Sequence, residues 1–301
     1  EDMLLPLNYD NIPNYQYISE DFRSLYYDPD NTYTVPYTYG IVGVIYNANV
    51  VDEADTGSWD LMWNPKYAGN ILQYNNARDA LGTAMYRAGI DVNTTNHAAW
   101  EQALQALVDQ RPLVKSYVMD EIYNMMESGE AAVASYYAGD YFTMCDAQAE
   151  NVDLQFYYPD ETNYFIDAMC IPKGCQNKAG AEAFINFLCR PDISAANLDY
   201  IGYSTPETAA KEYLDEEVIS SPVSYPDDET LARSESFAEL GVEATQTMND
   251  LWLSVKTSTA NTTTYLILTL VAIAAVAAFF IISGIVKRRK KARRCRKWKQ
   301  A

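Results

Sequence analysis

A run of 22 residues without a single charge, Tyr265–Val286, constrains this 301-residue chain more than any other feature. It reads YLILTLVAIAAVAAFFIISGIV. At 1.5 Å per residue a helix of this length is about 33 Å long, which is enough to cross the ~30 Å hydrocarbon core of a bilayer. The length and uniform apolarity disfavour a buried core helix. The run therefore predicts one transmembrane helix near the C-terminus.

The two sides of this run carry opposite charge. All 41 acidic residues precede Leu266 together with only 12 of the 22 Lys and Arg, which leaves residues 1–264 at −29. The other ten basic residues follow in Lys287–Lys299. Basic residues directly after a span are typical of the cytoplasmic side and of anionic lipid, although such a block also occurs in nucleic-acid-binding tails. We expect an extracytoplasmic domain, a polar linker at 257–264, a span at 265–286 and a basic cytoplasmic tail at 287–301.

Strand-like and helix-like patterns alternate before the linker, which is typical of an α/β domain. Thr32–Asn49 is rich in β-branched and aromatic residues and predicts a long strand, and Ile71–Tyr74 predicts a short one. Asn96 is a typical N-cap and begins a helix. Trp59 and Trp63 stand four residues apart, as core residues of a short helix commonly do.

The stretch Asn163–Pro206 contains the next strand and two helices. An apolar run to Ile171 predicts the strand, Pro191 ends the first helix, and Gly202 to Pro206 marks a turn. Aromatic residues surround a carboxylate within the strand. The pattern fits an ordinary α/β crossover and equally a ligand cleft at the ends of strands, and it does not choose between them.

The sequence favours neither catalysis nor a metal or cofactor site. His97 is the only histidine, so no Ser-His-Asp or Cys-His set is evident. The glycine-rich, HExxH and EF-hand patterns that bind nucleotides or metals are missing from the sequence. Cys170 and Cys175 are close enough in sequence to form a disulfide in an oxidising exterior, and this question stays open.

Binding of a small cation fits the composition better. Protonated amines are hydrogen-bond donors that require carboxylates or carbonyls, and aromatic faces suit both their charge and the methylenes between them. The chain has 25 Tyr and, before the linker, a large excess of acid. The field of such a domain attracts cations and disfavours phosphate, sulfate or nucleic acid as its ligand.

Several long stretches match one known family in the same order along the chain. They are DPDNTYTVPYTYGIVGVIYN, SWDLMWNPKYAGNILQYNNARDALGTAMYRAG, IDAMCIPKGCQNKAGAEAFINFLCRPDISA, IGYSTPETAA and YPDDETL. Together these stretches resemble the spermidine/putrescine-binding proteins of bacterial ABC polyamine importers. The resemblance extends over residues 3–255. It implies an α/β, two-lobed periplasmic-binding-protein (type II) fold in which each lobe is a mostly parallel sheet flanked by helices.

The resemblance also implies where the lobes lie. Lobe one would comprise residues 1–40 and 165–211, and lobe two residues 41–164 and 212–256. The chain would cross between them at Tyr37–Val42, a hinge segment. By the same comparison lobe one is incomplete, because about the first quarter of the binding domain is missing. That part, and an export signal, would lie upstream of Glu1, where a fused permease segment could precede them.

Individual site residues follow only from the resemblance. Asp167 matches an aspartate that binds a polyamine amino group, and Tyr203 matches a site tyrosine. Phe165 and Tyr137 stand where the family has tryptophans that contact the ligand, and Asp79 stands where it has a ligand glutamate. On pattern alone these residues read as core aromatics and a first-turn helix charge.

The sequence departs from the family at two further positions. Asn76 replaces an aspartate of the site, which removes one negative charge, and Phe237 lies near the position of a glutamine. We therefore expect a membrane-tethered solute-binding protein that captures spermidine or putrescine and delivers it to the ABC permease. The alternatives are a binding protein for another small organic cation or amine and, more remotely, a tethered surface enzyme. Neither the ligand nor the oligomeric state follows from the sequence.

Overall fold

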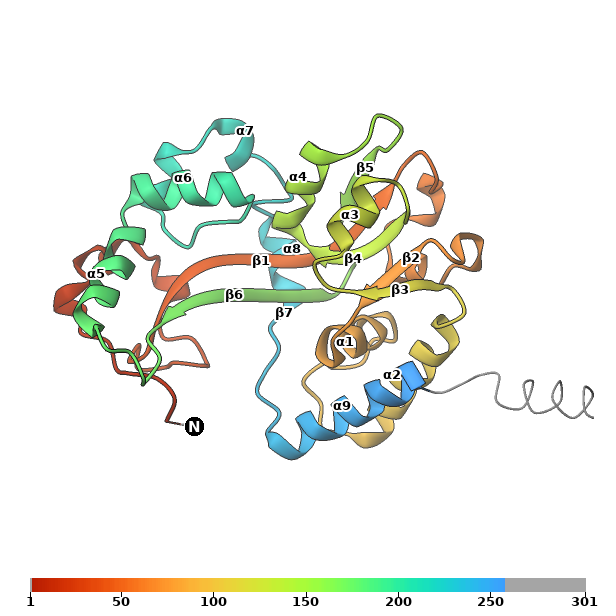
Figure 1. Ribbon diagram of the computed structural model, residues 1–301, viewed down its shortest axis with the longest axis horizontal. Helices are drawn as coiled ribbons and strands as arrows, with labels where there is room; N and C mark the ends of the chain where they lie inside the picture. The colour runs from red at the N-terminus through yellow and green to blue at the C-terminus, as the bar shows by residue number, and fades with distance from the viewer. Residues whose placement is uncertain (1, 258–301) are drawn as a thin grey trace, which may run out of the picture. The chain divides into compact units, whose positions relative to one another are not determined.

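The computed structural model describes residues 2–257, in which strands and helices alternate along the chain (Figure 1). The predicted span Tyr265–Val286, the linker from residue 258 on and the tail 287–301 lie outside the described residues. The strands are β1 (Thr34–Asn47), β2 (Ile71–Tyr74), β3 (Val114–Val118), β4 (Val133–Tyr137), β5 (Leu154–Tyr157), β6 (Thr162–Cys170) and β7 (Ser234–Glu235).

Nine α-helices and several short 3-10 helices are found in the same part of the chain. The α-helices are α1 (Ala77–Arg87), α2 (His97–Gln110), α3 (Ile122–Glu127), α4 (Ala138–Ala147), α5 (Lys178–Leu188), α6 (Pro191–Ile201), α7 (Glu216–Ile219), α8 (Asp228–Ala232) and α9 (Val242–Thr257). The 3-10 helices are η1 (Tyr9–Asn11), η2 (Pro13–Tyr17), η3 (Glu20–Phe22), η4 (Glu53–Asp55), η5 (Trp59–Trp63), η6 (Pro65–Tyr67) and η7 (Ala209–Tyr213).

The 14-residue strand β1 is the centre of a seven-stranded sheet with the order β3-β2-β4-β1-β6-β7. Its first part, Thr34–Ile41, pairs with β6. Its second part pairs with β4 and β5. β1 and β6 therefore lie side by side as a ribbon that joins the end of the molecule built on α5 and α6 to the end built on α1, α2 and α9 (Figure 1).

The expectation of mostly parallel sheets is wrong for the described strands. β1 is antiparallel to β4, β5 and β6, and parallel pairing is confined to β2 with β3, β2 with β4, and β6 with β7. The long strand β1 extends through both halves of the sheet. β6 returns beside its first part in the opposite direction, so the two strands of the ribbon are antiparallel.

Two hydrophobic clusters of unequal size lie at the two ends of this ribbon. The larger one packs β2, β4 and the second part of β1 against α1, α2 and α9, and it contains the buried Trp59 and Trp63. The smaller one consists of Ile12, Ile18, Val35, Ile171, Ile185 and Cys189. The interpretation of both tryptophans as core residues is confirmed. Their indole nitrogens donate to the carbonyls of Glu161 (2.7 Å) and Ala106 (2.8 Å).

Within residues 2–257 no helix is both long and apolar enough to cross a bilayer. The cysteines of this part, Cys145, Cys170, Cys175 and Cys189, are free thiols. Nor does this part of the chain bring three potential metal ligands together.

Candidate functional site

Three aromatic rings from distant parts of the chain meet beside the β1–β6 ribbon. Tyr137 ends β4, Phe165 lies in the middle of β6, and Tyr203 follows α6. The Phe165 ring centroid lies 5.1 Å from that of Tyr137 and 6.1 Å from that of Tyr203, both in edge-to-face geometry. The structure thus brings together the three aromatic residues predicted for the site. We call them the aromatic cluster.

Two glycines make room for these rings. A Cβ added to Gly40 on β1 would lie 2.7 Å from Phe165, and one added to Gly139 on α4 would lie 2.2 Å from the ring of Tyr203. No side chain fits at such distances. The glycine that follows β4 is therefore the reason that Tyr203 can lie flat against the start of α4.

Asp167 lies two residues beyond Phe165 on the same strand, so both side chains are on one face of β6. It is exposed, and its carboxylate accepts a hydrogen bond of 2.6 Å from the hydroxyl of Thr38. Thr38 is its register partner on β1 and is itself buried. The pairing of the two strands thus fixes the carboxylate at the edge of the aromatic cluster.

Asp140 is a second carboxylate at the cluster, and the sequence analysis missed it. It lies in the first turn of α4 and accepts hydrogen bonds from the hydroxyls of Tyr123 (2.6 Å) and Tyr203 (3.0 Å). Burial raises its pKa, the two hydrogen bonds oppose this rise, and the charges of Asp120 and Asp167 add to it. The available signal was a Gly-Asp pair directly after a buried strand, where side chains of an α/β site commonly lie.

Asp79 and Asn76 lie together at the start of α1. Asn76 is the N-cap: its side-chain oxygen accepts from the Asp79 amide at 2.8 Å, and its amide group donates to the Asp79 carboxylate. Burial raises the pKa of Asp79, against hydrogen bonds from Asn76 and Tyr137. The link through Tyr137 connects this pair to the aromatic cluster, so the six predicted residues form one connected set.

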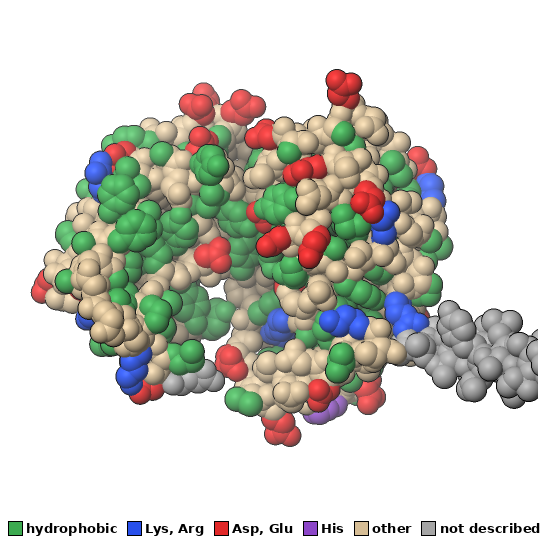
Figure 2. Space-filling view, in the orientation of Figure 1, with side chains coloured by type: hydrophobic (Ala, Val, Ile, Leu, Met, Phe, Trp, Pro, Cys, Tyr) green, Lys and Arg blue, Asp and Glu red, His purple; other side chains and the backbone are tan. Residues whose placement is uncertain are grey.

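Negative charge predominates at the site, although the charge of Arg78 lowers the pKa of Asp79. No ion pair in residues 2–257 involves Asp79, Asp140 or Asp167. The same three carboxylates raise the pKa of Tyr137, after burial as the largest cause. The guanidinium of Arg78 donates instead to the Val92 carbonyl at 2.9 Å. Figure 2 shows acidic side chains among hydrophobic ones over the middle of this face and, lower down, a hollow in the surface.

Two further groups lie at the border of the site. The hydroxyl of Tyr74 is buried and has no hydrogen-bond partner within residues 2–257, and its ring lies 5.9 Å from that of Tyr137. Phe237 packs instead on α1, near Gly82 and 4.4 Å from the Arg78 guanidinium. The structure therefore places Phe237 outside the aromatic cluster.

This arrangement is suited to holding a cation. Carboxylates in the described site accept hydrogen bonds from hydroxyls and amides, but none is next to a histidine or an activated nucleophile that would indicate acid–base or covalent chemistry. Aromatic faces between separated carboxylates provide both cation–π contacts and hydrogen-bond acceptors for an amine.

Comparison with known proteins also indicates a protein that binds a small solute. Residues 1–229 match the model of the bacterial extracellular solute-binding protein family. The chain belongs to this family. Its described part is an α/β structure with the architecture of a periplasmic binding protein, and its function is to bind a solute rather than to catalyse a reaction.

Individual relatives are similar over most of the chain. The spermidine/putrescine-binding periplasmic protein of Escherichia coli (strain K12) is 31% identical over 242 residues, which cover 80% of this chain and 69% of that protein. The putrescine-binding periplasmic protein SpuD of Pseudomonas aeruginosa is 26% identical, over 83% of this chain and 72% of its own length. A putative spermidine/putrescine ABC transporter from Listeria monocytogenes superposes with a TM-score of 0.80 at 33% identity, over 85% of this chain and 79% of that one. The resemblance to spermidine/putrescine-binding proteins is thus confirmed.

Proposed function

We propose that this chain is the extracytoplasmic solute-binding component of an ABC importer for polyamines. The observation that supports this most is the aromatic cluster with three carboxylates, Asp79, Asp140 and Asp167, that form no ion pair in the described residues. Asp79 and Asp140 are partly buried, and a partly desolvated carboxylate is stabilised when an ammonium group binds to it. The names of its relatives agree with a polyamine.

The carboxylates and the aromatic rings of the site would make different contacts with a polyamine. Asp167 would accept hydrogen bonds from one terminal ammonium, and Asp79 or Asp140 from another. The rings of Tyr137, Phe165 and Tyr203 would cover the methylenes and the charge, at roughly 0.5–2 kcal/mol for each well-placed cation–π contact. Asn76 would contribute indirectly, because its side-chain amide donates a hydrogen bond to the Asp79 carboxylate and fixes it in place.

We further propose that the binding domain consists of two lobes, residues 1–40 with 165–211 and residues 41–164 with 212–256. The two hydrophobic clusters at opposite ends of the β1–β6 ribbon support this division. Closure of the lobes about Tyr37–Val42 would exclude water and strengthen the charge pairs. A span at 265–286, with the tail 287–301 in the cytoplasm, would hold the domain close to its permease and raise its effective concentration there.

Calorimetric titration of the full chain with spermidine and putrescine tests the ligand. We expect micromolar or tighter binding of at least one of them, weakened at least about tenfold, or ~1.4 kcal/mol, by Asp167→Asn. Asp109→Asn on the exposed side of α2 is the matched control and leaves the affinity unchanged. A folded protein that gives no heat with either polyamine would contradict the assignment.

One observation favours testing a second class of ligand in the same way. Asn76 provides no charge, and Tyr and Phe are smaller platforms than the tryptophans implied by the resemblance. A smaller or singly charged organic amine is therefore the second candidate. Binding of such an amine with higher affinity than either polyamine would select it.

A further inference from the structure

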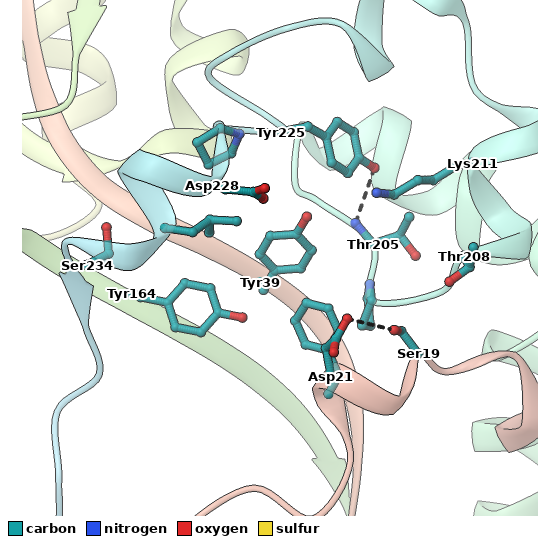
Figure 3. Close-up of a pocket in the computed structure, with 14 residues that line it drawn as sticks. Ser19, Asp21, Tyr39, Tyr164, Thr205, Thr208, Lys211, Tyr225, Asp228 and Ser234 are labelled. Atoms are coloured by element: carbon teal, nitrogen blue, oxygen red, sulfur yellow. Dashed lines mark hydrogen bonds between the residues drawn. The ribbon is translucent and has the colours of Figure 1, made fainter.

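A cavity of about 670 Å³ lies behind the β1–β6 ribbon (Figure 3). We call it the rear cavity. The residues that line it include Phe22, Tyr39, Tyr164, Lys211, Tyr225 and Asp228. Side chains alternate between the two faces of a strand. Tyr39 and Tyr164 therefore face the rear cavity, whereas Phe165 and Asp167 on the other face belong to the candidate polyamine site.

A lysine without a counter-ion lies in the wall of the rear cavity. Lys211 is half-buried, and its ammonium nitrogen lies 4.5 Å from the centre of the Tyr225 ring. Burial lowers its pKa, and no carboxylate acts against this. It makes no ion pair within residues 2–257. An ammonium group held in this way is stabilised by an anion from solution.

Carboxylates lie at other points of the same wall. Asp228 projects from the start of α8 toward the middle of the cavity, and Asp21 lies near Ser19, whose hydroxyl donates to it at 3.4 Å (Figure 3). Neither aspartate makes an ion pair in the described residues. A ligand with only positive charge would be repelled by Lys211, and one with only negative charge by the two aspartates. The wall therefore suits a molecule that carries both charges.

The remaining lining fits the body of such a molecule. Phe22, Tyr39, Tyr164 and Tyr225 provide aromatic surface, and Figure 3 shows the hydroxyls of the three tyrosines directed toward the interior. The hydroxyl of Tyr225 also accepts from the Thr205 amide at 3.4 Å, which fixes one of these groups. Ligand cavities of small molecules are commonly about 300–1,000 Å³ and combine apolar walls with a few polar groups.

We propose that the rear cavity binds a small zwitterionic amino-carboxylate, an amino acid or dipeptide, with its carboxylate at Lys211 and its ammonium group at Asp228. The site is separate from the aromatic cluster, and this inference does not depend on polyamine binding. Both sites share the β1–β6 ribbon. Occupancy of one is therefore expected to change the affinity of the other, and by the same factor in both directions.

The test uses the full chain in detergent and the dipeptide L-alanyl-L-leucine as probe, measured by calorimetry or ligand-observed NMR. Two matched probes each lack one charge: the N-acetylated dipeptide lacks the ammonium group, and the dipeptide amide lacks the carboxylate. We expect the dipeptide to bind with a dissociation constant of about 1 mM or tighter, and each capped probe to bind at least about tenfold more weakly.

Variants locate the site. Lys211→Met keeps the aliphatic stem and is expected to weaken dipeptide binding at least about tenfold, as is Asp228→Asn, whereas Lys211→Arg retains binding. Lys173→Met, at an exposed lysine outside the cavity, and Asp167→Asn both leave dipeptide binding unchanged. A thermal melt of each variant identifies loss of folding. The inference is overturned if the dipeptide fails to bind at about 5 mM, if Lys211→Met binds like the unmodified chain, or if spermidine displaces the dipeptide competitively.

Discussion

At the scale of single residues, Gly139 controls the position of Tyr203. A methyl group at this position would lie 2.2–2.7 Å from three atoms of the Tyr203 ring. We therefore expect Gly139→Ala to displace the ring and to break the 3.0 Å hydrogen bond from Tyr203 to Asp140. Overpacking of this kind costs about 1–3 kcal/mol. Calorimetry should show at least about tenfold weaker polyamine binding, and urea unfolding should show the lost stability.

Gly174→Ala is the matched control for this substitution. Nothing lies within 4 Å of a Cβ added there, and the backbone is not in the left-handed region. It should change neither the affinity nor the free energy of unfolding. Unaltered polyamine binding in Gly139→Ala would mean that the Tyr203 ring is not part of the binding surface.

Glu207 is a buried carboxylate whose ionisation opposes folding. It is only 3% exposed, and its Oε2 has no hydrogen-bond partner in the part of the chain that the structure describes. Burial raises its pKa from 4.5 to about 7 against a hydrogen bond from Ser194. Between these pH values the folded state keeps a proton that the unfolded state has released. Stability therefore falls as the pH rises from about 4.5 to about 7.

Glu207→Gln should remove this pH dependence. Urea unfolding at about pH 5 and pH 8 is expected to show a loss for the unmodified chain that exceeds the loss for the variant by up to about 3 kcal/mol. Glu212→Gln, on an exposed neighbour of the same segment, should behave like the unmodified chain. An equal loss in all three proteins would show that Glu207 ionises freely in the folded state.

At the scale of elements, the N-terminus of α1 combines a structural and a binding role. The Asn76 side chain caps the helix through the Asp79 amide and also contacts the Asp79 carboxylate. Asn76→Ala should lower the free energy of unfolding by about 1 kcal/mol, as loss of a cap commonly does. It should also weaken polyamine binding, because it releases the Asp79 side chain.

Asn96→Ala separates these two effects. Asn96 caps α2 in the same way, accepting from the Ala98 amide at 3.0 Å, but α2 provides none of the proposed contacts. It should cause a similar loss of stability with unchanged calorimetric affinity. If both variants bind polyamine equally well, Asn76 acts only as a cap.

The sequence predicts where helices and strands lie along the chain better than it predicts which strands pair with one another. The strand at Ile71–Tyr74 and the cap at Asn96 are where local patterns predict them, because turn residues and capping groups act over a few positions. The antiparallel partners of β1 were not predictable, because they depend on contacts between residues 87 to 136 positions apart.

The same limit applies to the candidate site. Asp167, Phe165 and Tyr203 could be named only because long stretches resemble a known family, and their meeting is visible only in three dimensions. Asp140 had no such match. Its role depends on Tyr123 and Tyr203, which approach it from different segments, and no local pattern in the sequence encodes that approach.

At the scale of the whole molecule, the charge of −29 on residues 1–264 should govern how ligand affinity responds to salt. Screening shortens the reach of this field from about 30 Å at 0.01 M salt to about 8 Å at 0.15 M. We expect polyamine affinity to fall over this range, and to fall more steeply for spermidine, with three amines, than for putrescine, with two. Titrations at several salt concentrations measure both slopes. Equal affinity across the series would indicate that only short-range contacts matter.

The two hydrophobic clusters also have a consequence for the order in which the domain opens. The smaller cluster has far fewer buried side chains than the larger one, so it is the less stable of the two. β1 passes through both. Amide hydrogens in the first part of β1 should therefore exchange with solvent through partial unfolding, whereas those in the second part should exchange only through global unfolding. Hydrogen exchange along β1 would thus give two different free energies of opening. The boundary between them would fall near Ile41, at the proposed hinge.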